Sequence, residues 1–341
     1  MKRLVIAAAL AVVSTTAQAQ ATDCPAGVAT AVTPAQQGQN ASRDVCLRAK
    51  DVFSLLAPQL GAAITAGNAV LGQGGTLGGL GHFTIEVRGT GVLNGSVPDV
   101  PKWSGLATTT PPASQELQTK KFPVPNAVID GAIGVFKGLP LGLTNVGGID
   151  ILGSVTYIPT IDQNQIKVTP DANTKFGYGA RVGLLQESLL VPGVSATWMK
   201  RDLPTTTIDG TGTFTGTTMS FTMADAAIKT TSWRLVASKS FILFGLAAGY
   251  GRDSYDESAT FSGTATVLTQ STSFAPFTVS SKMTRSNVFA DASINLLLVK
   301  LVGEIGQVSG GEVSPAPFNT FSGGKVDDSR TYGSVGLRFS W

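Results

Sequence analysis

Hydrophobic and polar residues alternate with a period of two in segment after segment between residues 82 and 341. The last segment shows this most clearly, because every second residue from Val335 to Trp341 is hydrophobic while Arg338 and Ser340 lie between them. Such alternation predicts a β-strand with one apolar and one polar face. The pattern predicts about ten strands, near residues 82–93, 126–137, 148–160, 174–186, 192–204, 228–239, 241–253, 283–295, 298–309 and 328–341.

The two faces of these strands predict an all-β fold, an antiparallel transmembrane β-barrel. In the segment 174–186, Phe176 and Tyr178 would face lipid while Arg181 would face the lumen. A closed ring of strands can cross a bilayer because every backbone N–H and C=O is paired between strands. The segment 205–223 could form a further hairpin, so twelve or fourteen strands are alternatives.

The connections between the strands alternate in length. Short links are expected on the periplasmic side and long Pro-, Thr- and Ser-rich segments on the outside. An even number of strands places both barrel termini on the periplasmic side, where an N-terminal plug would enter. The short links lie near 138–147, 187–191, 239–241 and 295–298, and the long segments near 94–125, 161–173, 205–227, 254–282 and 310–327.

The N-terminal region predicts a plug for this barrel. Residues 20–40 are polar and predict a loop. Apolar residues then recur at helical spacing for about four turns from Ser42, with Asn40 or Ser42 as the cap and Pro58 as the end or a break. The glycine-rich segment 61–81 predicts irregular backbone that packs closely inside or against the barrel. Its glycines follow no strand and open no helix, so a nucleotide-binding loop is not supported.

The chain begins with the features of an export signal. Lys2 and Arg3 precede an apolar run over residues 4–13, and cleavage is expected after Ala19, with Ala21 as the alternative. Export of this kind predicts a location in the outer membrane of a Gram-negative cell. The expected division is a signal peptide over 1–19, a helix and glycine-rich plug over 20–81 and a transmembrane barrel over 82–341.

Composition narrows the class of protein further. The 341 residues include 40 glycines, only 14% are charged, and no apolar run after the signal approaches the ~20 residues of a membrane helix. Removing the signal takes away two positive charges and no acid, so the formal net charge of +3 falls to +1. A near-neutral chain without a basic block excludes nucleic-acid partners.

Cys24 and Cys46 are the only cysteines, and export places both in an oxidising compartment. We expect a disulfide between them, with a stabilisation of roughly 3 kcal/mol from closing the loop. Two thiols and a single histidine fall short of the four ligands of a structural metal site. We therefore expect no metal and no other cofactor.

Charged residues on the polar faces predict the character of the lumen. They could form a weakly selective polar conduit. The favoured interpretation is that they pair across the lumen or with Arg48, Lys50 and Asp51 of the plug, because buried charges need partners, which predicts a closed or narrow pore. These inward residues are Glu86, Arg88, Asp130, Asp150, Arg181, Arg234, Asp291, Glu304 and Arg338.

Apolar residues could line a pocket for a hydrophobic molecule. The candidates are Val52, Phe53 and Leu56 on the plug helix, with Phe136 and Phe289 on the barrel wall. Simple packing of the helix against the wall is the more common arrangement. Aromatic rings elsewhere predict a girdle at the membrane interface, and they are Trp103, Trp198, Trp233, Trp341, Tyr157, Tyr178 and Tyr250.

His82 is the only histidine and is a candidate general base. Its place at the start of the first strand, on the expected periplasmic side, favours a structural role, and we expect no catalytic residue and no enzyme activity. Phe339 and Trp341 predict the C-terminal signal by which the barrel assembly machinery recognises such strands. The other expected partners are the lipids of the outer membrane.

Together, the export signal, the helix, the glycine-rich segment and the terminal Leu337-Arg338-Phe339-Ser340-Trp341 resemble bacterial outer-membrane barrels with an internal N-terminal plug. The general plan is similar to the long-chain fatty-acid transporter (FadL-like) superfamily and its uncharacterised relatives. The resemblance covers the whole mature chain but transfers no individual ligand-binding residue. It implies a plugged channel for a small, hydrophobic solute. The alternative is a structural or surface-interaction barrel without transport.

Overall fold

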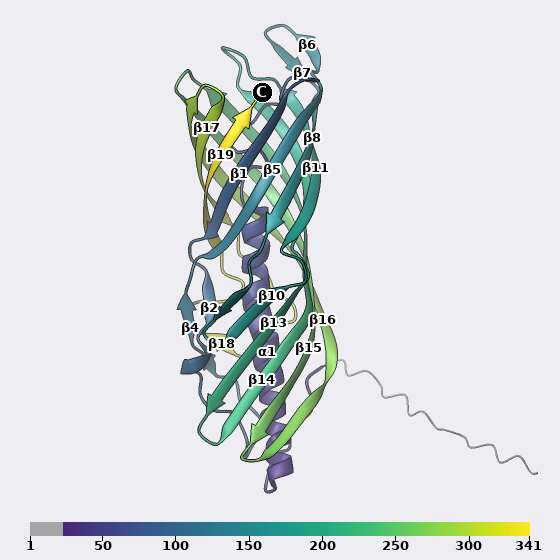
Figure 1. The fold of residues 1–341 in the computed structure, drawn as a ribbon, viewed down its shortest axis with the longest axis vertical. Coiled ribbons are helices and arrows are strands. Elements are labelled where there is room, and N and C mark those ends of the chain that lie inside the picture. Colours follow the sequence, from purple (N-terminus) through teal and green to yellow (C-terminus); the bar gives the residue numbers. More distant parts are fainter. Residues whose placement is uncertain (1–22) are drawn as a thin grey trace, which may run out of the picture.

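The computed structural model describes residues 23–341, and its main feature is a ring of ten antiparallel strands (Figure 1). Each strand pairs with the next, and the last pairs with the first, so the sheet closes on itself. All ten predicted strands are present, whereas the expected signal peptide lies outside the described residues. In order around the ring, the strands are β1 (Phe83–Val92), β5 (Val124–Phe136), β8 (Gly148–Tyr157), β11 (Thr174–Leu185), β12 (Gly193–Asp202), β14 (Thr217–Ser240), β15 (Phe244–Val267), β16 (Gln270–Leu296), β17 (Val299–Val308) and β19 (Arg330–Ser340).

Three strands continue well beyond this ring. β14, β15 and β16 are 24, 24 and 27 residues long, and their far parts form a curved sheet that we call the extension. β13 (Thr206–Phe214), β10 (Ile166–Pro170) and β9 (Ile161–Gln163) add to its edge. The prediction of loops over 254–282 and 205–227 is therefore wrong, although the alternative of a hairpin near 205–223 is confirmed by the pairing of β13 with β14.

The remaining wall of the extension is made of short elements and loops from residues 94–123 and 309–329. β2 pairs with β4, β18 pairs in parallel with β3, and β6 and β7 form a small hairpin at the other end of the molecule. Their bounds are β2 (Ser96–Pro98), η1 (Val100–Lys102), β3 (Glu116–Leu117), β4 (Thr119–Lys121), β6 (Leu139–Leu141), β7 (Thr144–Val146) and β18 (Thr320–Phe321).

The apolar face changes sides along the long strands. In the ring part of β15, Leu246 and Tyr250 are exposed on the outside, as the sequence pattern predicts. In the extension the same strand turns Tyr255 and Phe261 inward, and both are fully buried. This reversal explains why the sequence predicts loops over 205–227 and 254–282. The outer face of these strands is rich in Thr and Ser, as loops are, while their inner face forms a core.

The core of the extension surrounds one long helix, α1 (Pro34–Thr65). It begins with a capping box in which the Thr33 hydroxyl accepts from the Gln36 N–H, and the Gln36 side chain accepts from the Thr33 N–H. The predicted loop over 20–40 is found over residues 23–33 but is wrong from Pro34 onward, and the prediction of a cap at Asn40 or Ser42 is wrong. Pro58 lies inside the helix, which continues because both of its flanks are buried against the wall. No helix within residues 23–341 is long and apolar enough to cross a membrane.

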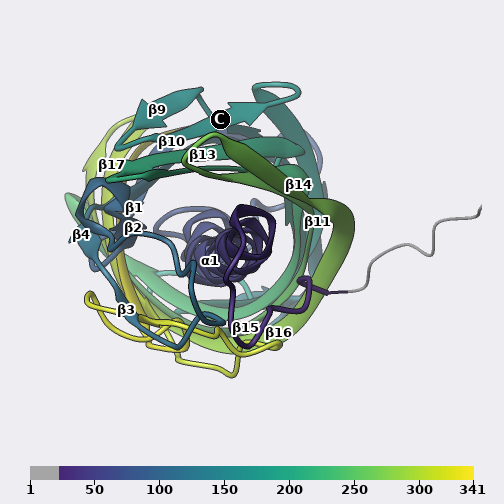
Figure 2. The same cartoon turned by 90° about the horizontal axis from the view of Figure 1, so that it is seen from below.

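The path of the N-terminal region runs through the interior (Figure 2). Near its start, α1 contacts Thr272 at the far tip of the extension, and near its end Gly61 contacts Tyr255. Residues 66–81, which we call the inner segment, continue through the ring and reach His82 at the end that carries Trp341. The prediction that the N-terminal plug enters from the end that carries Trp341 is therefore wrong, because α1 starts at the opposite end of the molecule.

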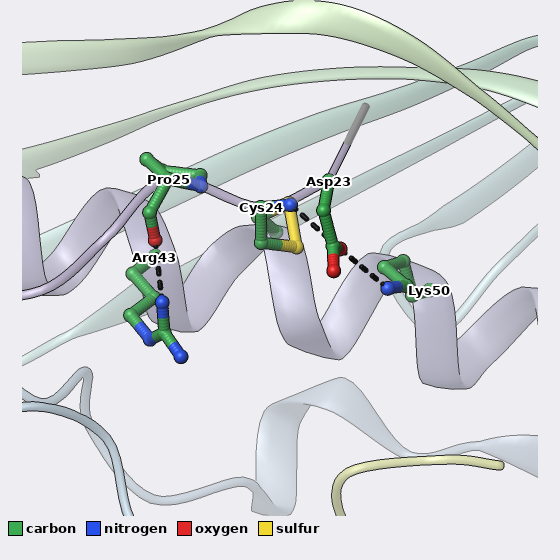
Figure 3. The surroundings of a disulfide bond; sticks show 6 residues. Asp23, Cys24, Pro25, Arg43 and Lys50 are labelled. Carbon is green, nitrogen blue, oxygen red and sulfur yellow. Dashed lines mark hydrogen bonds and ion pairs between the residues drawn. A yellow bond between two sulfur atoms is a disulfide. The ribbon is translucent and has the colours of Figure 1, made fainter. Parts of the chain in front are cut away.

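The residues before α1 are tied to it by the predicted disulfide, which is confirmed. Cys24 and Cys46 form this bond beside two further contacts (Figure 3). The Lys50 ammonium lies 2.6 Å from the Asp23 carboxylate, and the Arg43 guanidinium donates to the Pro25 carbonyl at 2.7 Å. The chain is thereby fixed alongside the helix from residue 23 onward.

Aromatic side chains form a band on the outside of the ring close to the extension. Trp198 of β12 lies opposite Trp233 of β14, and each makes an edge contact with a tyrosine, Tyr178 and Tyr250 respectively. Trp103 does not belong to this band. It is buried in the extension, where its indole N–H donates to the Gln118 carbonyl, because the segment that carries it folds inward over α1.

Candidate functional site

Ion pairs line the interior of the ring. Asp130 of β5 accepts from both Arg88 and Arg201 at 2.6 and 2.7 Å. Arg181 and Asp150 lie 2.7 Å apart. All nine charged residues singled out in the sequence are buried on the inner face: Glu86, Arg88, Asp130, Asp150, Arg181, Arg234, Asp291, Glu304 and Arg338.

The ion pairs of this interior include two charged residues that were missed in the sequence. Arg201 is the last residue but one of β12, and Asp253 lies in β15, where it contacts Arg234 at 2.6 Å. Both stand at inward positions of predicted strands, so the period of two alone could have found them. Both complete pairs with residues that were identified: Asp253 neutralises Arg234, whereas Asp130 is shared by the two guanidinium groups of Arg88 and Arg201.

Wall carboxylates bind the backbone N–H groups of the inner segment. Glu304 accepts from the Asn68 N–H at 2.8 Å, and Glu86 accepts from the Leu71 N–H at 2.9 Å. Asp291 accepts from the Gly72 N–H at 3.0 Å. These donors belong to irregular backbone, which would otherwise be buried without hydrogen bonds at a cost of several kcal/mol, on the order of the burial of an unpaired polar group.

Wall guanidinium groups bind the carbonyls of the same segment. Arg88 donates to the Asn68 carbonyl at 2.7 Å, Arg234 donates to the Gly67 carbonyl at 3.0 Å, and Arg338 donates to the Leu71 carbonyl. Gly67 has φ +67°, and a Cβ there would lie about 2 Å from the Glu304 carboxylate. Glycine is therefore required for the segment to come this close to the wall.

The helix charges do not take part in these contacts, so the expected pairing of wall charges with Arg48, Lys50 and Asp51 is wrong. Arg48 pairs with Asp44 one helical turn away, at 3.0 Å, and Lys50 pairs with Asp23. The physical reason is the position of α1, whose charged residues lie in the extension and not inside the ring.

Asp51 binds a loop of the extension instead. Its carboxylate accepts from the backbone N–H groups of Phe318 and Asn319 at 2.8 and 3.0 Å and from the Asn319 side-chain amide at 2.8 Å. Burial raises the pKa of Asp51 to about 6, and the three hydrogen bonds to the carboxylate oppose this rise.

An apolar cavity of about 130 Å³ lies between α1 and the wall, where the ring meets the extension. Phe53 and Leu56 line it, whereas Val52 is fully buried in the helix packing. The other lining residues come from the start of β5, from the connections after β8 and β12, and from β9, β10, β13 and β14. They include Val124, Ile158, Ile161, Ile166, Leu203, Ile208, Ala226 and Ile228.

The cavity lies where the sheet of the extension stops. β9 pairs only with β10, so its other edge has no strand partner among residues 23–341, and Ile161 and Gln163 of β9 line the cavity. The two wall phenylalanines expected there lie elsewhere. Phe136 is exposed because a bulge shifts the register beside it, and Phe289 packs against Ala62 and Ala63 of α1.

A second, open hollow lies at the end of the ring that carries Trp341. The inner segment contributes Gln73, Thr76 and Leu77 to it, and the wall contributes Lys300 and Arg338. His82 lies exposed at this mouth. The inner segment therefore separates the apolar cavity from the mouth. In the described part of the chain, no three His, Cys, Asp or Glu side chains are grouped to hold a metal ion.

Comparison with known proteins yields only distant structural neighbours. No family profile matches the chain, and no curated protein matches it. Among solved structures, it resembles a bacterial polysaccharide outer-membrane secretin (7% identity, 78% of this chain and 100% of the other, TM-score 0.22) and the Ralstonia pickettii toluene transporter TbuX (8%, 92% and 95%, 0.23). Pseudomonas putida OprB is a further neighbour (7%, 76% and 93%, 0.20). These neighbours are outer-membrane or porin-type proteins, and none has sufficient similarity to assign a family or a substrate.

Proposed function

We propose that this chain is an outer-membrane barrel that admits a small hydrophobic solute, with the inner segment as its gate. One observation carries the proposal, the order of three features along the axis of the ring. These are the apolar cavity, the inner segment with its backbone hydrogen-bonded to wall side chains, and the open mouth.

The location in a membrane is supported by the outer surface of the ring. Its outward residues are apolar, with Ile85, Ile151 and Val335 at least half exposed, and the band of Trp and Tyr rings follows their edge toward the extension. Apolar residues prefer hydrocarbon, and aromatic rings prefer the headgroup region. The polar outer face of the extension is suited to water, so the extension would project from the bilayer.

The hydrophobic nature of the solute is supported by the lining of the cavity. Its walls are mostly aliphatic and aromatic side chains with few polar groups, which is typical of sites for apolar ligands. Its volume is close to that of engineered apolar cavities, of about 150 Å³, that take up a molecule the size of benzene. The interrupted sheet beside β9 offers a route into the cavity from the side of the extension.

The gate is assigned to the inner segment and not to α1. The helix forms the core of the extension together with many apolar residues of the wall, and the disulfide fixes its start. The inner segment is held by hydrogen bonds to side chains of the wall and by a small apolar cluster, in which Ala69 and Val70 pack with Ala132, Leu152 and Met199. This cluster is much smaller than the core around α1, and segments with fewer buried apolar contacts open at lower free-energy cost.

The test is to fill the cavity and measure binding and flux. Ala226→Phe places a ring into the cavity, and Ala224→Phe, on the same strand but outside the cavity lining, is the matched control. We expect Ala226→Phe to weaken binding of p-xylene to the purified protein at least tenfold and to slow its uptake into proteoliposomes, with no change in the control. Equal binding and no flux in all three proteins would instead favour a structural barrel.

A further inference from the structure

Four polar residues interrupt the apolar lining of the cavity, Asn126, Gln163, Asn164 and Thr206, and among them only Asn126 has a buried side-chain atom without a hydrogen bond in the described part of the chain. Asn126 of β5 lines it, is only 8% exposed, and is held by a single hydrogen bond of 3.3 Å from its side-chain N–H to the Ala63 carbonyl. Its side-chain carbonyl oxygen is buried and accepts no hydrogen bond from any residue in the range 23–341. Such an oxygen is costly to bury unless a partner donates to it.

The side-chain N–H of Asn126 has one acceptor partner, the Ala63 carbonyl. Since Ala63 lies on α1 and Asn126 on the wall, the hydrogen bond between them fixes the amide at the base of the cavity. The fixed amide leaves one acceptor free beside a space that is otherwise apolar. Thr206, a further polar residue of the lining, already donates to the Pro204 carbonyl.

We propose that the cavity takes a small, mainly apolar molecule that carries one hydroxyl or N–H group, and that Asn126 accepts the hydrogen bond from that group. The inference rests on the proposed function and specifies the class of solute. A water molecule is a poor match for the same place, because a buried water needs two to four polar partners and most of the lining is aliphatic or aromatic. A saturated hydrocarbon fits the wall but leaves the oxygen unpaired.

The experiment uses p-cresol and p-xylene, which differ only by a hydroxyl in place of a methyl group. Dissociation constants for both are measured with the full-length protein and with Asn126→Leu, which has a similar volume and no acceptor. The ratio of the two constants in each protein cancels the different solubility of the probes. We expect the preference for p-cresol to fall about tenfold in Asn126→Leu, as for the loss of one buried hydrogen bond.

Asn126→Ser guards against a Leu variant that does not fold, because serine is too short to place an oxygen at the same point. A crystal structure of the unmodified protein with p-cresol is the second measurement. We expect the phenol oxygen within about 3.2 Å of the Asn126 amide oxygen. Phenol density elsewhere in the cavity, or a water molecule that stays on the amide, would overturn the proposal.

The outcomes separate this inference from the function on which it rests. If both probes bind but their ratio is unchanged in the Asn126 variants, the solute class is wrong while an apolar binding cavity remains. If neither probe binds the unmodified protein, or if filling the cavity with Ala226→Phe leaves binding unchanged, both the inference and the proposed function are overturned.

Discussion

Arg88 and Asp130 lie side by side on β1 and β5, with 2.6 Å between guanidinium and carboxylate, and the same guanidinium holds the carbonyl of Asn68 in the inner segment. We expect Arg88→Met to loosen the inner segment while the ring stays intact, because Asp130 keeps Arg201 as a partner. Losing a hydrogen bond from a charged group costs about 1.5–3 kcal/mol. Single-channel recordings should show open events roughly 10 to 100 times more often.

The control for this variant is Lys282→Met. Lys282 and Asp256 form an exposed pair at 3.4 Å on the outside of the extension, and exposed pairs contribute little. It should leave the recordings unchanged. If Arg88→Met opens no more often than the unmodified protein, the hydrogen bond from Arg88 does not hold the inner segment closed.

A membrane around the ring makes a prediction for the outward positions of its strands. Val335 lies near the middle of β19 and is exposed. Val335→Arg should lower the free energy of unfolding in lipid by about 2–4 kcal/mol, since this places a charge in hydrocarbon. Thr278→Arg, at an exposed position of the extension, should change it by less than about 0.5 kcal/mol. Urea titrations in lipid vesicles measure both, and equal effects would place the ring outside the bilayer.

The disulfide should stabilise the extension and not the gate. We expect the Cys24→Ser and Cys46→Ser double variant to lose about 3 kcal/mol of stability, in line with the loop of 22 residues that the bond closes. Limited proteolysis should then cleave near the start of α1, and conductance should stay at its former level. A large rise in open events would show that the gate extends into the helix.

Asp51 should make the stability of the extension depend on pH. Its folded pKa of about 6 lies above the ordinary value of 3.8, so the folded protein binds more protons than the unfolded chain between those values. This contribution to stability is fully present below about pH 4 and is lost as pH rises through 6. Relative to Asp51→Asn, the unmodified protein should lose about 2 kcal/mol between pH 4 and 7. Urea titrations at both pH values measure it, and a constant difference contradicts the assignment.

The strands of the ring could be predicted from the sequence because one face of each strand is apolar and the other is polar, which gives a period of two. In β19 the alternation is complete from Val335 to the end of the chain, and the predicted and observed limits differ by a few residues. The far parts of β15 and β16 alternate as well, with Phe261 and Phe277 inward. The sequence predicts loops there because Thr and Ser on the outer face lower the overall hydrophobicity, and because the apolar face changes from the outside to the inside where the ring meets the extension.

The helix and the site needed information of two other kinds. Thr33 and Gln36 have the spacing of a capping box, with Pro34 at the first helical position, so a local signal for the start of α1 was present. The cavity had no such signal, because Asn126, Ile161 and Ala63 are distant in sequence. Only the folding of β9 and β10 back onto β13 brings them to the same place.

The direction of α1 has a consequence for biogenesis. α1 and the inner segment run from the far tip of the extension to the end of the ring that carries Trp341. If the ring closed before they were in place, the free N-terminal end would have to be threaded through the closed ring. Closure of β1 against β19 around an already seated N-terminal stretch avoids this. If the proposed membrane location holds and Trp341 faces the periplasm, as expected from the sequence, an epitope joined just ahead of Asp23 would be accessible on intact cells, and one joined after Trp341 would not.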